Sequence, residues 1–265
     1  MGELRVGTSG WVYADWRGRF YPETLKQKDY LYYYSRHFNS AEINASFYHL
    51  PERDTFAQWA ESVPDDFVFA VKASRFITHV RRLKDVEEPW KRFLEHASAL
   101  GHKLGPILIQ LPPNYRCDRP ALEAFLQMAQ ESGSHRLAFE FRHASWFDPA
   151  ILELLRRCRA AAVIADSSRY PQAPAVPTTH FVYLRFHGPA ELFASRYTDQ
   201  QLESWASKIR SWLEAGKTVY AYFNNDFHAY AVANAKRLVE LVAGIGKSGQ
   251  RKRSTVVAPS SADSG

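Results

Sequence analysis

Short runs of β-forming residues alternate with amphipathic segments along most of the chain. Eight runs have the apolar content and length of buried strands. They span residues 4–10, 41–47, 67–74, 106–112, 137–141, 161–166, 181–188 and 218–225. The segments between them carry apolar residues at helical spacing, as in residues 120–130 and 201–216. Strands that alternate with helices predict a parallel α/β sheet, and eight such units predict closure into a TIM-like (β/α)8 barrel.

The predicted helix boundaries support the same architecture. Asp118, Asp148 and Thr198 each stand just before a segment with helical periodicity, where a side chain that accepts backbone N–H groups is favoured. The sixth connection differs, because residues 166–180 contain three prolines. We therefore expect one TIM-like barrel domain over residues 1–243, with an irregular sixth crossover. No GxGxxG motif follows a strand, which disfavours a dinucleotide-binding fold.

The polar residues of the predicted strands form a pattern of their own. In a parallel barrel the outward face of each strand is covered by helices and must be apolar, so polar strand residues must point inward. Applied strand by strand, this rule selects Glu42, Asn44, Lys72, Ser74, Gln110, Glu140, Arg142, Asp166, Arg185, His187, Tyr222 and Asn224. All lie toward the C-terminal ends of their runs, where α/β barrels carry their active sites. The sequence therefore predicts a charged site at the C-terminal rim.

Composition and charge narrow the class of protein. The formal net charge is +6, and the last twenty residues contribute half of it, with four cations against Asp263. Residues 244–265 hold too few apolar side chains to pack, so we expect a disordered basic tail there. Two cysteines are too few for a disulfide framework. The chain shows neither a signal-peptide pattern nor a long apolar run, so we expect a cytoplasmic protein with no membrane partner.

Several short motifs together resemble those of the YecE-like family, a domain of unknown function (DUF72). In chain order they read "VGTSGW", "AEINASFY", "FAVKAS", "LIQLPP", "FEFRHASW", "YLRFHG" and "YFNND". They extend from about Val6 to Leu241, which is nearly the whole chain apart from the tail. The resemblance implies a TIM-like barrel that tolerates an irregular sixth unit, and it implies no settled reaction. The motif positions coincide with the inward rim residues selected by strand alternation.

The chemistry of these side chains suggests their roles. Carboxylates and imidazoles transfer protons, so we assign catalysis to Glu140, Asp166, His187 and Glu42. Guanidinium and ammonium groups bind phosphate oxygens, so we assign the anionic part of a ligand to Lys72, Arg142 and Arg185. Polar and aromatic residues at the strand ends complete the predicted substrate contacts, namely Asn44, Gln110, Trp11, Trp146, Tyr222 and Asn224. We assign no metal ligand, and the sequence points to no particular cofactor.

The leading hypothesis is an enzyme that binds a nucleotide, nucleic-acid fragment or sugar phosphate and performs hydrolytic or acid/base chemistry on it. One alternative is a noncatalytic nucleic-acid-binding module that uses the basic tail and the aromatic rim. Another is a metal-dependent phosphodiesterase similar to apurinic endonuclease-type barrels, with ligands drawn from His79, Glu140, Asp166, His187 and Asp226. In a third, the charged residues form a stabilising ion network in the barrel without any chemistry.

Overall fold

Nine parallel strands form the centre of the molecule. A computed structural model of the chain describes residues 2–244. Its strands are β1 (Leu4–Thr8), β2 (Ser40–Ile43), β3 (Val68–Lys72), β4 (Leu104–Gln110), β5 (Leu137–Glu140), β6 (Ala161–Ala162), β7 (Ile164–Asp166), β8 (Phe181–Phe186) and β9 (Thr218–Phe223). They pair in two sheets, ordered β1-β9-β8-β7 and β2-β3-β4-β5-β6. Read in turn, the two sheets follow the cyclic strand order of a (β/α)8 barrel.

The two sheets adjoin at both of their ends. At one end β1 meets β2 through a bridge between Ser9 and Glu42. Gly7 permits this approach, because a Cβ atom there would lie 1.9 Å from the Ser40 carbonyl oxygen. At the other end the chain passes directly from β6 to β7 through Val163, so these two short strands together occupy the sixth position. The TIM-like prediction is confirmed, with the sixth strand divided between the sheets.

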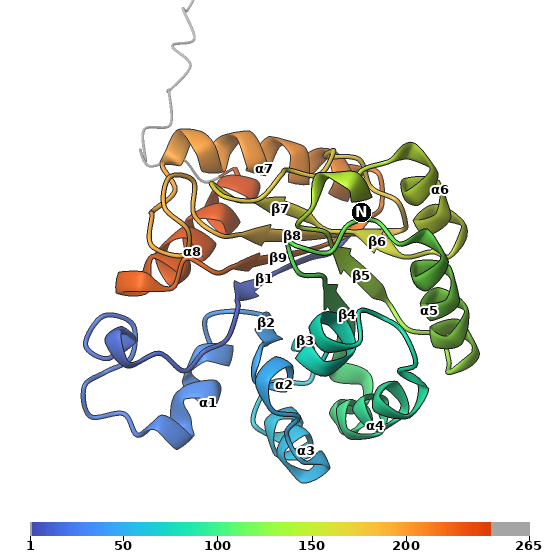
Figure 1. Ribbon diagram of the computed structural model, residues 1–265. Helices are drawn as coiled ribbons and strands as arrows, with labels where there is room; N and C mark the ends of the chain where they lie inside the picture. Colours follow the sequence, from blue (N-terminus) through green and yellow to red (C-terminus); the bar gives the residue numbers. More distant parts are fainter. Residues whose placement is uncertain (1, 245–265) are drawn as a thin grey trace, which may run out of the picture.

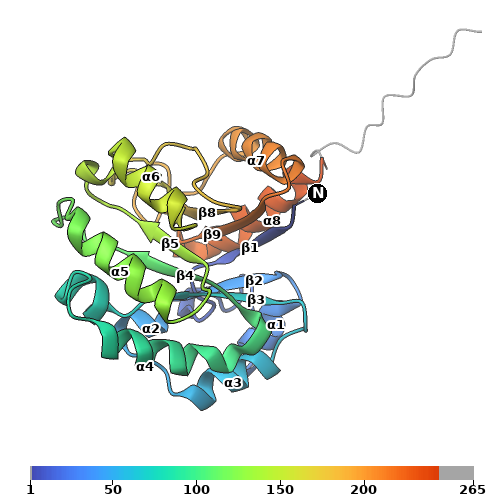
Figure 2. The ribbon, with the colours of Figure 1, turned by 90° about the vertical axis from the view of Figure 1, so that its right-hand side faces the viewer.

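Helices surround the strands on their outer side (Figures 1 and 2). They are α1 (Tyr30–Ser35), α2 (Ala45–Tyr48), α3 (Arg53–Glu61), α4 (Glu87–Ala97), α5 (Arg119–Glu131), α6 (Pro149–Arg157), α7 (Asp199–Glu214) and α8 (Tyr230–Val242). The three predicted caps are confirmed: Asp118 accepts from the Ala121 amide, Asp148 accepts from the Ala150 amide, and Thr198 forms a capping box with Gln201.

Two apolar layers hold the fold together. The larger layer lies between strands and helices and includes Trp90, Phe139 and Leu184. The smaller layer fills the barrel interior with side chains such as Leu108 and Tyr183. Successive side chains of each strand point alternately to the outer and the inner layer. The inward side chains therefore lie in the interior layer or, at the C-terminal end of the strand, at the rim of the barrel.

The sixth crossover is irregular, as the prolines predict. Residues 167–180 contain no helix or strand. Within residues 2–244, no helix is both long and apolar enough to cross a membrane. The predicted tail begins at residue 244 and otherwise lies outside the described residues.

Candidate functional site

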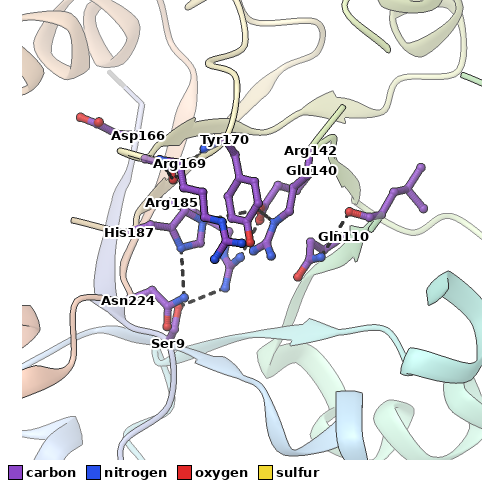
Figure 3. A network of polar contacts seen from close by, with 12 residues as sticks. Ser9, Gln110, Glu140, Arg142, Asp166, Arg169, Tyr170, Arg185, His187 and Asn224 are labelled. Atoms are coloured by element: carbon purple, nitrogen blue, oxygen red, sulfur yellow. Dashed lines mark hydrogen bonds and ion pairs between the residues drawn. The ribbon is translucent and has the colours of Figure 1, made fainter. Parts of the chain in front are cut away.

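A cluster of paired charges closes the interior of the barrel at its C-terminal end. Arg185 of β8 stands between two carboxylates: its Nη2 donates to Glu42 Oε1 at 2.7 Å and its Nη1 donates to Glu140 Oε2 at 2.5 Å. Arg142 Nε donates to Glu140 Oε1 at 2.8 Å. We call Glu42, Glu140, Arg142 and Arg185 the ion cluster. It brings together four residues that lie on three different strands or directly after them. Figure 3 shows three of them, Glu140, Arg142 and Arg185.

Burial and pairing determine the ionisation of the cluster. Glu42, Glu140 and Arg185 are almost completely buried. Burial would raise the pKa of Glu42, but Arg185, Tyr183 and Ser9 together reverse this and hold the pKa below its ordinary value. Burial likewise opposes ionisation of Glu140, and the charges of Arg142 and Arg185 bring its pKa well below the usual range. The two carboxylates and the two guanidinium groups therefore balance one another in charge.

Above the ion cluster lies a cavity of about 590 Å³, which we call the mouth pocket. It is lined by residues from most of the barrel loops: Tyr13, Asn44, Phe47, Tyr48, Lys72, Arg75, His79, Gln110, Arg142, Tyr170, Arg185, Phe193, Asn224 and Asp226. Arg142 lies against the Tyr170 ring, with its guanidinium carbon 4.3 Å from the ring centroid. Glu42 and Glu140 are not among the lining residues, because the arginines cover them. The mouth pocket therefore exposes cations and hides the carboxylates that pair with two of them.

Lys72 ends β3 and is the most unusual residue of the pocket wall. Only 8% of its surface is exposed. Its Nζ lies 3.9 Å from the centroid of the Phe47 ring and makes no hydrogen bond or ion pair with another residue in the described range. Burial, followed by the charges of Arg185 and Arg142, lowers the pKa of Lys72 to about 7. Near neutral pH the amine is thus divided between its charged and uncharged forms.

Asp226 follows β9 and also lines the mouth pocket. Its Oδ1 is buried and has no hydrogen-bond partner among residues 2–244. Burial raises the pKa of Asp226 to about 8, so its carboxyl group is largely protonated at neutral pH. Trp16 Nε1 donates a hydrogen bond of 2.8 Å to the backbone carbonyl of Asp226. His228 and Ala229, two and three residues after Asp226, adopt left-handed backbone conformations.

Several of the predicted contact residues do gather around this pocket. Asn44, Gln110 and Asn224 line it together with Lys72, Arg142 and Arg185. Asn224 Nδ2 lies 3.1 Å from His187 Nδ1, and His187 Nε2 lies 3.4 Å from Glu140 Oε1 without forming a hydrogen bond. Burial lowers the pKa of His187 to about 4, so the imidazole is neutral. His187 is fully buried, and its contact with Asn224 holds that side chain at the pocket wall.

The inward orientation predicted for Asp166 is wrong. Its Oδ2 accepts a hydrogen bond of 2.8 Å from Trp205 Nε1 on α7, so the carboxylate points toward the helix layer. Figure 3 shows Asp166 directed away from Glu140 and Arg185. The strand supplies the reason: Ile164 packs in the outer layer, and Asp166, two residues further on, shares that face. Its pKa is raised by burial against α7, away from the mouth pocket.

Three predicted aromatic contacts also lie elsewhere. Trp146 is fully buried and stacks on Phe141 with ring centroids 4.8 Å apart, so a ligand cannot touch it. Trp11 packs against Trp59 in the outer layer, outside the mouth pocket. Tyr222 does point into the barrel, but it lies deep in the interior layer and bonds to Ser40 Oγ at 2.7 Å. None of the three lines the mouth pocket.

Sequence reasoning missed four residues of the pocket wall, one of which is Phe193 in the connection between β8 and α7. Tyr13 comes from the loop after β1, and Arg75 precedes the π-helix Phe76–Val80 after β3. Tyr170 comes from the irregular sixth crossover. Strand alternation could not select them because they stand in loops. Across residues 2–244, no three His, Cys, Asp or Glu side chains are grouped so that they could hold a metal ion.

Comparison with known proteins gives a consistent assignment. The model of the family described as "Protein of unknown function DUF72" matches residues 5–256. The UPF0759 protein YunF of Bacillus subtilis is 28% identical over 90% of this chain and 94% of its own, and the UPF0759 protein YecE of Escherichia coli is 27% identical over 78% and 81%. The crystal structure of a DUF72 family protein from Thermotoga maritima superposes with a TM-score of 0.80 at 29% identity, covering 91% of this chain and 99% of that one.

Proposed function

The chain belongs to the DUF72 family, and we propose that it is an enzyme that binds a phosphate-bearing small molecule in the mouth pocket and carries out acid/base chemistry on it. The observation that carries the proposal is the unbalanced charge of the pocket lining. Four basic side chains line the cavity, Lys72, Arg75, Arg142 and Arg185, against Asp226, whose carboxyl is largely protonated. A phosphate group would supply the missing negative charge.

Pairing within the ion cluster leaves Lys72 and Arg75 as the source of this imbalance. Arg185 and Arg142 already share the charges of Glu42 and Glu140, whereas Lys72 and Arg75 have no ion pair with any residue in the described range. Arg75 is exposed at the pocket rim, and Lys72 is buried in its wall. A ligand that bridges the two would meet one exposed and one buried basic group, which suits a phosphate ester whose remaining atoms extend into the cavity.

The proton-transfer role fits Asp226 better than the carboxylates selected from the sequence. Glu42 and Glu140 are ionised, fully paired and covered by arginines, so neither can reach a ligand in this arrangement. Their geometry favours the ion-network alternative, in which they hold Arg142 and Arg185 in place. Asp226 has an unpaired buried oxygen, lines the cavity and has a pKa near the working pH of a general acid.

Calorimetric titration with inorganic phosphate and with ribose 5-phosphate tests the proposed site. We expect both to bind the wild-type protein, and Arg75→Ala and Arg142→Ala to weaken binding by roughly 10–100-fold, the effect of losing a charge-assisted hydrogen bond. Arg157→Ala is the matched control, because Arg157 is exposed on α6 and does not line the pocket. The proposal is wrong if wild type binds neither compound, or if the pocket variants bind as tightly as the control.

A second candidate function is the binding of single-stranded nucleic acid. It is favoured by two exposed aromatic side chains beside the mouth pocket: Tyr48 is 81% exposed and Phe76 is 47% exposed, with Arg75 next to the latter. Such side chains can stack on bases. An oligonucleotide should then bind with an affinity that falls steeply with salt and drops several-fold in Tyr48→Ala. Binding that is independent of salt or of Tyr48 would exclude this candidate.

A further inference from the structure

Two buried lysines of this chain differ in how their ammonium groups are satisfied. Lys103 is 7% exposed, and its Nζ donates to the carbonyl oxygens of Ala60 at 2.7 Å and Val63 at 2.9 Å. Lys72 is equally buried at 8%, yet its Nζ lies over the Phe47 ring and makes no hydrogen bond or ion pair with any other residue of 2–244. A buried charge without partners is costly. The comparison shows that Lys72 is held in a position that disfavours its charged form and leaves its nitrogen open to the mouth pocket.

The charges that face Lys72 come from every element around it. They are Arg142 after β5, Arg185 of β8, Glu140 of β5, Glu42 of β2 and His79 of the π-helix after β3. The carboxylates among them are already paired with the arginines, and the pKa of His79 is lowered to about 4. Burial and the two guanidinium groups therefore dominate, and about half of the Lys72 amine is uncharged at pH 7. Desolvation next to other cations is how proteins activate a nucleophilic lysine.

We propose that the Lys72 amine is a nucleophile that forms an imine with an aldehyde or ketone carrying a phosphate group. This inference rests on the proposed function and specifies the class of its substrate. The cations at the rim, Arg75 and Arg142, would hold the phosphate, while the carbonyl carbon meets Nζ above the Phe47 ring. Asp226 lines the same cavity as a protonated acid, so a nucleophile and a proton donor face the same ligand.

The reaction needs no oxidant, reductant or metal. The nitrogen lone pair forms the C–N bond while the carbonyl π electrons move to oxygen, which accepts the proton of the Asp226 carboxyl. The Asp226 carboxylate then takes a proton from nitrogen, which gives a neutral carbinolamine. Return of that proton to the hydroxyl oxygen allows the C–O bond to break. Water leaves, the nitrogen lone pair forms the C=N bond, and the products are a protonated imine, one water molecule and ionised Asp226.

Reductive trapping tests this chemistry in the full chain. Glycolaldehyde phosphate is added at pH 7 with sodium cyanoborohydride, which reduces an imine to a stable secondary amine, and modified lysines are located by peptide mass spectrometry. An exposed lysine of pKa about 10.5 is uncharged in only about 1 molecule in 3,000 at this pH. We therefore expect Lys72 to be trapped at least about 100-fold faster than exposed Lys91 of α4, and Lys103 to remain unmodified.

Two variants and one probe separate the roles. Lys72→Arg keeps a cation in the wall, so it should still bind inorganic phosphate by calorimetry while losing the adduct. Asp226→Asn, which cannot donate an acidic proton, should slow trapping at Lys72 at least tenfold. Unphosphorylated glycolaldehyde should react with Lys72 at least tenfold more slowly than its phosphate ester, and excess inorganic phosphate should slow trapping by the ester.

The outcomes distinguish this inference from the proposed function. Trapping at Lys72 no faster than at Lys91, in protein that binds phosphate, would overturn the imine and leave the phosphate site standing. Rapid trapping at Lys72 that neither needs the phosphate ester nor responds to inorganic phosphate would support the nucleophile and overturn the phosphate site. Slow trapping in protein that binds no phosphate would overturn both.

Discussion

Replacing Arg185 by methionine isolates the energetic role of the ion cluster. Methionine is unbranched and apolar and replaces the aliphatic stem of arginine, so the change removes the charge and its hydrogen bonds while keeping part of the packing. In the wild type, Arg185 is 1% exposed and donates to both Glu42 and Glu140. The variant leaves Glu42 with hydrogen bonds only from Ser9 and Tyr183, and leaves Glu140 with Arg142 alone. Two buried carboxylates then lose most of the interactions that offset the free-energy cost of burying their charge.

The size of the effect follows from the number of broken pairs. Removing one partner of a buried ion pair destabilises a protein by ~3–5 kcal/mol, because the remaining charge stays buried. Arg185 serves two pairs, and effects within one network do not add. We therefore expect the free energy of unfolding to fall by at least about 4 kcal/mol, and the melting temperature to fall by roughly 8–16 °C for a chain of this size.

Urea unfolding followed by tryptophan fluorescence measures the change, and Arg157→Met on the surface of α6 is the control. Neutralising the two buried carboxylates as well, in Glu42→Gln/Glu140→Gln/Arg185→Met, should restore at least half of the loss, since no unpaired carboxylate remains. A loss below about 1 kcal/mol for Arg185→Met would refute the reasoning, as would a triple variant less stable than the single one. Either result would mean that solvent, rather than Arg185, compensates the two carboxylates.

Three further predictions concern pH and the corrected residue. Lys72→Met should stabilise the protein at pH 7 by an amount on the order of 2–4 kcal/mol, because the folded state lowers the pKa of this lysine to about 7. The gain in stability should shrink toward pH 10.5, and urea titrations over pH 7–10 measure this change. Glu42 and Glu140 have lowered pKa values in the folded protein, so the stability that they contribute is complete above their pKa of about 4.5 in the unfolded chain. This stability should decline as the pH falls below that value, and acid titration followed by circular dichroism measures the decline. Asp166→Asn should leave the affinity for phosphate within twofold of wild type by calorimetry. A larger loss would mean that Asp166 takes part in the mouth pocket.

Much of the fold could be predicted because periodicity, caps and crossovers agree with one another. The eight strand positions, the caps Asp118, Asp148 and Thr198, and the irregular sixth crossover all follow from local sequence. The division of the sixth strand at Val163 could not be predicted in this way. It depends on how the β6 and β7 segments pair with their different neighbours, and a run of small apolar residues carries no sign of that break.

The candidate site was predictable where apolar and polar residues alternate. On β5 and β8 the pattern of Phe139, Glu140, Leu184 and Arg185 assigns each side chain to one face, and the structure agrees. In residues 161–166 every position before Asp166 is apolar, so alternation cannot indicate which face is inward. The Trp205 indole on α7 donates a hydrogen bond to the outward-facing carboxylate of Asp166, which compensates the cost of burying that polar group.

Loop residues were beyond the reach of strand alternation. Tyr13, Arg75 and Tyr170 enter the pocket through the shapes of their loops, which no periodicity encodes. Trp146 shows the reverse error: it follows a strand and could contact a ligand by its position in the sequence, but a short 3-10 turn folds its ring back onto Phe141. Proximity to a strand end was therefore a good guide for the polar residues and a poor one for the aromatic residues.

Part of the mouth pocket is built from segments that lie outside the helices and strands of the barrel. Tyr170 lies in the crossover without helix or strand, and Phe193 lies in the connection between β8 and α7. Lys72, Glu42, Glu140 and Arg185, by contrast, lie on the strands themselves. Insertions or exchanges in the two connections can therefore reshape the cavity while the reactive groups keep their spacing. Homologues that act on ligands of different size should diverge in these two segments and share the strand-borne charges.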